Sequence, residues 1–133
     1  MNNVEWSEAL SLGFEPMDAT HREFVDLLAK TQMAEDADLG ECWRTVIEHT
    51  QRHFAREDRW MKKSHFATAE NHLLQHRVVL NLMREGLVFA RNGQFEAVRE
   101  MAGELGSWFA KHTQSLDAAL ALHMRREPEL ASH

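Results

Sequence analysis

The chain contains nine histidines among 133 residues, and several stand at helical spacings from one another or from a carboxylate. The run HLLQH places His72 and His76 four residues apart, and HFARE does the same for His53 and Glu57. Side chains four residues apart lie on one face of an α-helix, one turn from each other. With the histidine of DATH and the pair in HTQSLD, the candidates for shared chemistry are His21, His53, Glu57, His72, His76, His112 and Asp117.

These imidazoles and carboxylates are the donor types of a metal site. A single histidine on an apolar helix face is usually a hydrogen-bonded core residue. Burying all seven without compensation would cost many kcal/mol against a marginal net stability, and metal ions provide compensation in helix bundles. Nitrogen and oxygen donors without thiolates suit iron, zinc, copper or manganese, and seven are too many for one tetrahedral zinc. Two octahedral ions, bridged by the carboxylates and an oxo or hydroxo group, would use this set and keep one position open.

Four helices are expected to carry these residues. Apolar residues recur at spacings of three and four from Asp18 to near Arg126, and the two prolines, Pro16 and Pro128, lie near the ends. Asp18 is expected to cap the first helix, and Gly93 to end the third in a left-handed conformation. The predicted helices run over Ala19–Met33, over Glu41–Lys63, from a start signal at Thr68, Asn71 and His72 to Ala90, and over Phe95–Met124.

Short connections between these helices predict an all-α fold, an antiparallel up-down-up-down four-helix bundle. The acidic segment 34–40 is expected to be one of the connections. We expect a single domain with three parts: an N-terminal arm that packs on the bundle (1–17), the bundle itself (18–126) and a tail (127–133).

Some details around the candidate ligands stay open. His112 and Asp117 are about 140° apart on a regular helix, so they reach one site only from different sides of the apolar stripe or across a local bulge. The second ring nitrogen of each histidine needs a partner, for which Glu23, Gln75 and Gln114 are candidates. His49 is expected to be solvated or hydrogen-bonded. Four apolar side chains flank the candidates, either as pocket lining or as ordinary core: Trp60, Trp108, Phe109 and Leu116.

Composition limits the classes of partner. The net charge is −6 and no long basic block occurs, which argues against nucleic acid and against a membrane surface. The single cysteine, Cys42, excludes an internal disulfide and favours a reducing compartment. The opening MNNVEWSEALSLGFEP has no long apolar run, so we expect no signal peptide and a cytoplasmic location. Short loops favour a monomer.

The order His … HxxxE … HxxxH … HxxxxD resembles the hemerythrin family, in particular the single-domain bacteriohemerythrins. The segment EWSEALSLGFEPMDATH resembles the arm of that family leading into its first ligand, and WFAKHTQSLD resembles its fourth-helix segment. HFARED resembles the usual His-Phe-x-x-Glu-Glu, with Asp58 in place of the second, non-ligand glutamate. The similarity covers essentially the whole chain.

The resemblance implies a four-helix bundle with a non-haem di-iron centre, oxo- or hydroxo-bridged, that binds O2 reversibly. Carried over by position, it implies that His72, His76 and His112 bind one iron. It further implies that His21 and His53 bind the other iron, which keeps the open position. Glu57 and Asp117 are then the bridging carboxylates.

The ligand types favour a carrier over an enzyme. Di-iron oxygenases and ferritins use carboxylate-rich sites, whereas neutral imidazoles dominate here. We therefore expect O2 storage or delivery inside a bacterial cell, with O2 as ligand and an oxygen-consuming enzyme as a candidate partner. Two other classes stay open: sensing of O2, NO or redox state, and a di-iron enzyme acting on peroxide or nitric oxide.

Overall fold

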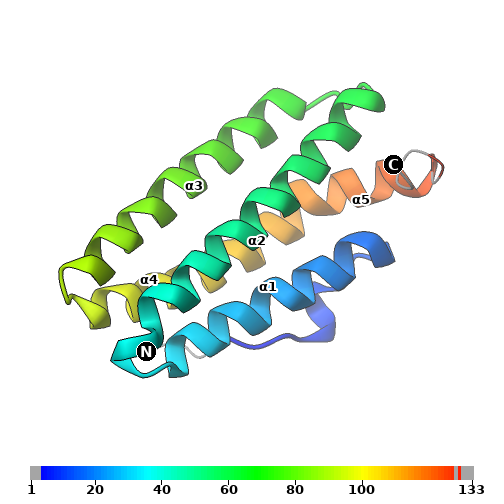
Figure 1. Ribbon diagram of the computed structural model, residues 1–133. Coiled ribbons are helices and arrows are strands. Elements are labelled where there is room, and N and C mark those ends of the chain that lie inside the picture. Colours follow the sequence, from blue (N-terminus) through cyan, green and yellow to red (C-terminus); the bar gives the residue numbers. More distant parts are fainter. Residues whose placement is uncertain (1–3, 128, 130–133) are drawn as a thin grey trace.

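The computed structural model describes residues 4–127 and 129, and within them every regular element is helical (Figure 1). The elements are a 3-10 turn (Glu8–Leu10), α1 (Glu15–Met33), α2 (Asp36–Lys63), α3 (Ala69–Arg91), α4 (Phe95–His112), a π-helical turn (Thr113–Asp117) and α5 (Ala118–Arg125). The last three elements form the fourth long helix of the bundle. The predicted all-α four-helix bundle is confirmed, and most of the predicted tail lies outside the described residues.

Two predicted helix starts are wrong. Helix α2 begins at Asp36, so the acidic segment 34–40, predicted to be a connection, largely forms the first turn of this helix. Carboxylates in that turn interact favourably with the helix dipole, and Leu39 is fully buried. Helix α1 begins at Glu15, with Phe14 at the N-cap position, so Asp18 lies inside the helix rather than capping it. Gly93 does adopt the predicted left-handed conformation, with φ of +74°.

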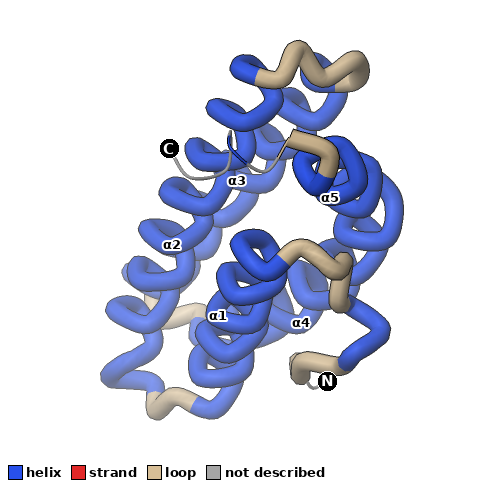
Figure 2. Tube along the Cα trace, turned by 90° about the vertical axis from the view of Figure 1, so that its right-hand side faces the viewer, coloured by secondary structure: helices blue, strands red, loops and turns tan. Residues whose placement is uncertain are grey.

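Asp18 instead holds the N-terminal arm against the bundle. Its buried carboxylate accepts hydrogen bonds from the hydroxyl of Ser11 (2.9 Å) and the backbone N–H of Leu12 (2.8 Å). The side chains of Leu10 and Phe14 are buried, which confirms that the arm packs on the helices. Figure 2 shows the arm crossing beside α1 and α4.

The apolar core consists of two clusters with the polar candidates between them. One cluster includes Phe24 and Phe109, and the other includes Met17 and Leu120. On α1, His21 falls between Met17 and Phe24 in the sequence. Along the fourth helix, the candidate ligands fall between Phe109 and Leu120 in the same way. None of the helices in the described range is both long and apolar enough to cross a membrane.

Close packing of α2 on α3 depends on Gly86. The indole of Trp43 is fully buried, and its Nε1–H donates to the carbonyl of Met83 at 2.7 Å. A Cβ atom on Gly86 would lie 2.4 Å from that Nε1. We expect Gly86→Ala to lower the free energy of unfolding by about 1–3 kcal/mol, because overpacking outweighs the better helix propensity of alanine. Urea unfolding measures the change.

Gly40 provides the matched control. It also lies inside a helix, but a Cβ atom there would meet only the Cβ of Ala90 at an ordinary 3.9 Å. Gly40→Ala should leave stability unchanged or raise it by up to about 1 kcal/mol. Equal effects of the two substitutions would contradict the proposed packing constraint.

Candidate metal centre

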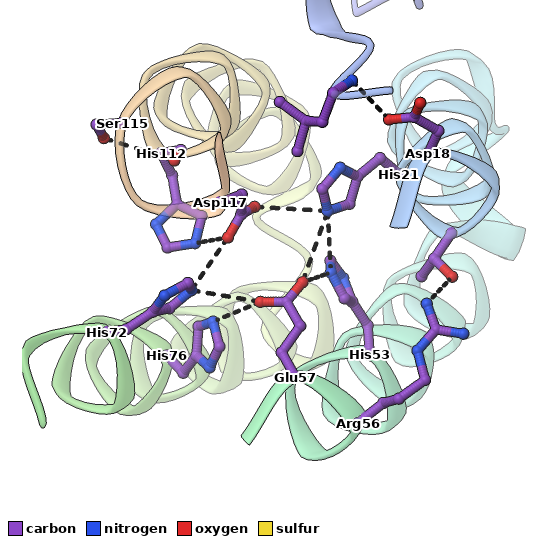
Figure 3. A network of polar contacts seen from close by, with 12 residues as sticks. Asp18, His21, His53, Arg56, Glu57, His72, His76, His112, Ser115 and Asp117 are labelled. Atoms are coloured by element: carbon purple, nitrogen blue, oxygen red, sulfur yellow. Dashed lines mark hydrogen bonds and ion pairs between the residues drawn. The ribbon is translucent and has the colours of Figure 1, made fainter. Parts of the chain in front are cut away.

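Five imidazoles and two carboxylates meet in the middle of the bundle (Figure 3). The set spans all four long helices and consists of His21 on α1, His53 and Glu57 on α2, His72 and His76 on α3, His112 at the end of α4, and Asp117 in the π-helical turn. None of the seven residues is more than 4% exposed. The structure thus brings together every candidate ligand that the sequence suggested, and each ring directs its Nε2 atom at a carboxylate.

Glu57 faces histidines on two sides. Its Oε1 lies 3.3 Å from Nε2 of His72 and 3.2 Å from Nε2 of His76. Its Oε2 lies 2.5 Å from Nε2 of His53 and 3.6 Å from Nε2 of His21. One carboxylate therefore reaches two separate groups of imidazoles, each with a different oxygen.

Asp117 divides its oxygens in the same way. Oδ1 lies 3.0 Å from Nε2 of His72 and 2.9 Å from Nε2 of His112, whereas Oδ2 lies 3.4 Å from Nε2 of His21. The donors therefore form a group of three histidines and a group of two. Each carboxylate presents one oxygen to each group.

The π-helical turn explains how His112 and Asp117 reach one site. In this turn the backbone N–H of Ala118 donates to the carbonyl of Thr113, five residues earlier. The wider turn reduces the angle between residues five apart, which would be about 140° in a regular helix. Of the two routes that the sequence left open, the structure shows the local bulge. π-Bulges of this kind occur frequently at functional sites.

Two of the five rings are oriented through their second nitrogen. The Nδ1 of His112 pairs with Oε1 of Gln75 at 3.1 Å, as the sequence suggested, and the Nδ1 of His76 pairs with Oδ1 of Asp58 at 2.9 Å. Such contacts place the proton on Nδ1 and leave the Nε2 lone pair free for a metal. Asp58 was missed as a partner, although its place directly after Glu57 in HFARED was a usable signal.

The other two suggested partners have different outcomes. The prediction that Glu23 pairs with a candidate ligand is wrong. Its carboxylate faces Nε2 of His49 at 3.9 Å rather than a ring of the cluster. The side chain of Gln114 lies outside the described part of the chain. His49 itself is buried and not solvated, and its Nδ1 has no hydrogen-bond partner.

The charges of the cluster compensate one another. Burial alone would raise the pKa of Glu57, but the adjacent imidazoles, led by His53, hold it well below its ordinary value. Burial likewise acts to lower the pKa of His72, yet contacts with Asp117 and Glu57 raise it from 6.5 to about 9. The pKa of His76 is also raised, because Asp58 and Glu57 outweigh burial. The pKa values of both rings are raised because the negative carboxylates beside them favour the charged imidazolium form.

The donor atoms fit a metal better than they fit one another. The Nε2 atoms of His72, His76 and His112, together with Oε1 of Glu57 and both oxygens of Asp117, are buried without a hydrogen-bond partner. Groups of this kind are costly in a folded protein and call for an explanation such as an ion. Imidazole nitrogens and carboxylate oxygens are the donors that non-haem iron accepts.

A comparison with known families agrees with this geometry. The profile of the Hemerythrin HHE cation binding domain matches residues 12–127. The chain belongs to the hemerythrin family. A bacteriohemerythrin of Ralstonia nicotianae is 38% identical over 114 residues, which cover 86% of this chain and 83% of that protein. Bacteriohemerythrins of Stenotrophomonas maltophilia and Pseudomonas paraeruginosa are 26% and 25% identical, over 87% and 89% of this chain and 78% and 79% of their own lengths. No solved structure gives a significant match.

Aromatic rings enclose the site of this hemerythrin-family chain. Phe54 stacks on His76 with ring centroids 3.7 Å apart, and Phe109 meets His21 edge-on at 4.9 Å. Trp108 stacks on His112 at 4.6 Å. The sequence pointed to Trp108 and Phe109 as neighbours of the site but not to Phe54. These rings cover one side of His76, His21 and His112 with aromatic surface.

Metal binding should release protons near neutral pH. The pKa of His72 in the metal-free chain is about 9, so its ring is protonated at pH 7 and must lose that proton to become a ligand. We expect metal affinity to rise with pH through this range. Calorimetric titration of Zn²⁺ in buffers of different ionisation enthalpy measures the number of protons released, and a value of zero at pH 7 would contradict the proposed coupling.

Proposed function

We propose that this chain binds O2 reversibly at a di-iron centre in the middle of the bundle. In this assignment His72, His76 and His112 hold one iron, and His21 and His53 hold the other. Glu57 and Asp117 bridge the two. The proposal rests on how the carboxylate oxygens are arranged. Each carboxylate directs one oxygen to the group of three histidines and the other to the group of two.

The unequal groups determine where a small ligand would bind. Three imidazoles and two carboxylate oxygens serve the first position, whereas two imidazoles and two carboxylate oxygens serve the second. The position beside His21 and His53 is therefore the one with a ligand site to spare. When bound, the iron pair supplies the electrons for reversible O2 binding.

The protein environment favours release of O2 over its activation. Neutral imidazoles outnumber carboxylates, in contrast to the Glu-rich sites of ferritin-like di-iron proteins. Asp58 and Gln75 hold two of the rings in the tautomer a metal requires, and Phe54, Phe109 and Trp108 pack against three of the imidazoles. Storage of O2, or its delivery to an oxygen-consuming enzyme, fits this environment better than catalysis.

Reversible binding is tested with the iron-loaded protein. We expect two iron ions per chain by metal analysis. We expect a colourless reduced form that gains iron charge-transfer absorption in air and loses it again when O2 is removed. Absorption that appears once and decays to a permanent ferric form would contradict reversible binding and favour the redox-sensing or enzymatic alternative.

The role of His76 as a ligand is tested by His76→Ala. The substitution removes a donor from the group of three histidines, so we expect iron bound per folded chain to fall markedly. His65→Asn is the matched control, because His65 is exposed, belongs to neither group and has φ of 54°, which asparagine tolerates. Equal iron content in the two variants would argue against the ligand assignment.

A further inference from the structure

A second, positively charged site lies on the outside of the bundle, between α1 and α2. It is an open pocket of about 310 Å³, lined by Thr20 and Glu23 on α1 and by His49, Arg52, His53, Arg56 and Arg59 on α2. A volume at the lower end of the range of ligand sites suits a small ligand. The pocket shares His53 with the proposed metal centre, but the rest of its lining plays no part in that centre.

The pocket is strongly cationic in an otherwise acidic protein. The chain carries a net charge of −6, yet three arginines line the pocket against one carboxylate, Glu23. In the described part of the chain, neither Arg52 nor Arg59 has an ion-pair or hydrogen-bond partner, although ion pairs fix Arg22 and Arg99 elsewhere. Arginine stays protonated at all physiological pH values, so this excess charge is permanent.

Neutral oxygen atoms, rather than carboxylates, accept the hydrogen bonds of Arg56 in the described part of the chain. Its guanidinium donates to the carbonyl of Pro16 at 2.5 Å and to the hydroxyl of Thr20 at 2.6 Å, and it lies over the ring of Trp60 at 4.7 Å. In Figure 3 it points away from Glu57, toward α1. Its Nε atom is buried and has no hydrogen-bond partner.

A second donor group in the pocket is also unsatisfied. His49 is 9% exposed, and its Nδ1 atom is buried without a partner. Its Nε2 faces only Glu23, at 3.9 Å, whose carboxylate is largely exposed. The lining therefore combines free positive charge with buried polar atoms that lack partners.

We propose that this pocket binds a small oxyanion of the phosphate class, held by Arg52, Arg56 and Arg59 with His49 beside it. Planar guanidinium groups are well suited to phosphate oxygens, because they donate two parallel hydrogen bonds. The group comes either from free inorganic phosphate or from the phosphate ester of a small metabolite. A metal cation is excluded by the charge of the lining.

The test is calorimetric titration of inorganic phosphate into the iron-loaded full chain, with the absorption spectrum followed in parallel. We expect one phosphate per chain, with a dissociation constant on the order of 1 mM or tighter. We expect no change in the iron bands. A second titration with glycerol phosphate separates the two sources: tighter binding than inorganic phosphate indicates an ester, and weaker binding indicates the free ion.

Arg52→Gln combined with Arg59→Gln should weaken phosphate binding by about tenfold or more, because two charge-assisted contacts are lost. Both side chains are exposed and unpaired within the described residues, so the fold should not suffer. Arg44→Gln, an exposed position on the same helix outside the pocket, is the matched control.

Three results would overturn the proposal: no phosphate binding to the unmodified chain, an unchanged affinity in the double variant, or an equal loss in the control. Iron content and O2 binding are measured separately on the same samples. Failure of the oxyanion site is thus distinguishable from failure of the proposed O2 function.

Discussion

The bundle depends on the mutual compensation of charge in its buried centre. Seven polar side chains lie between two apolar clusters, where an isolated charge would be very costly. Glu57 and Asp117 make the arrangement possible, because each carboxylate faces imidazoles on two sides. Removing one partner would leave another buried and unsatisfied, so the cluster behaves as a unit.

The surrounding helices are built to hold this centre rigidly. Every long helix contributes to it, so a shift of one helix would misplace donors relative to the other three. Close packing of Trp43 over Gly86 fixes α2 against α3, and Asp18 fastens the arm beside His21. Rings stacked on the imidazoles restrict them further. Such pre-organisation lets a ligand bind without a large reorganisation of the site.

The sequence predicted those features that depend on spacing along one helix. HxxxE and HxxxH place their members on one face, and the order of all seven candidates across four helices indicates the family. The features it did not predict depend on contacts between helices. Asp58 orients a histidine of α3 from α2, Asp18 binds backbone of the arm, and the cationic pocket draws on both α1 and α2. The early start of α2 was missed because its acidic first turn has little apolar character.

The π-helical turn also changes the direction in which the side chains of the following helix, α5, point. It contains one residue more than a regular turn would need, so the helix beyond it is rotated by about 100° relative to an uninterrupted one. In that rotated phase Leu120, Ala121 and Met124 of α5 are all buried. Deleting a single residue between His112 and Asp117 would therefore do more than misplace the Asp117 carboxylate. It would turn the apolar side of α5 out of the core, which links the integrity of this end of the bundle to the same irregularity that completes the site.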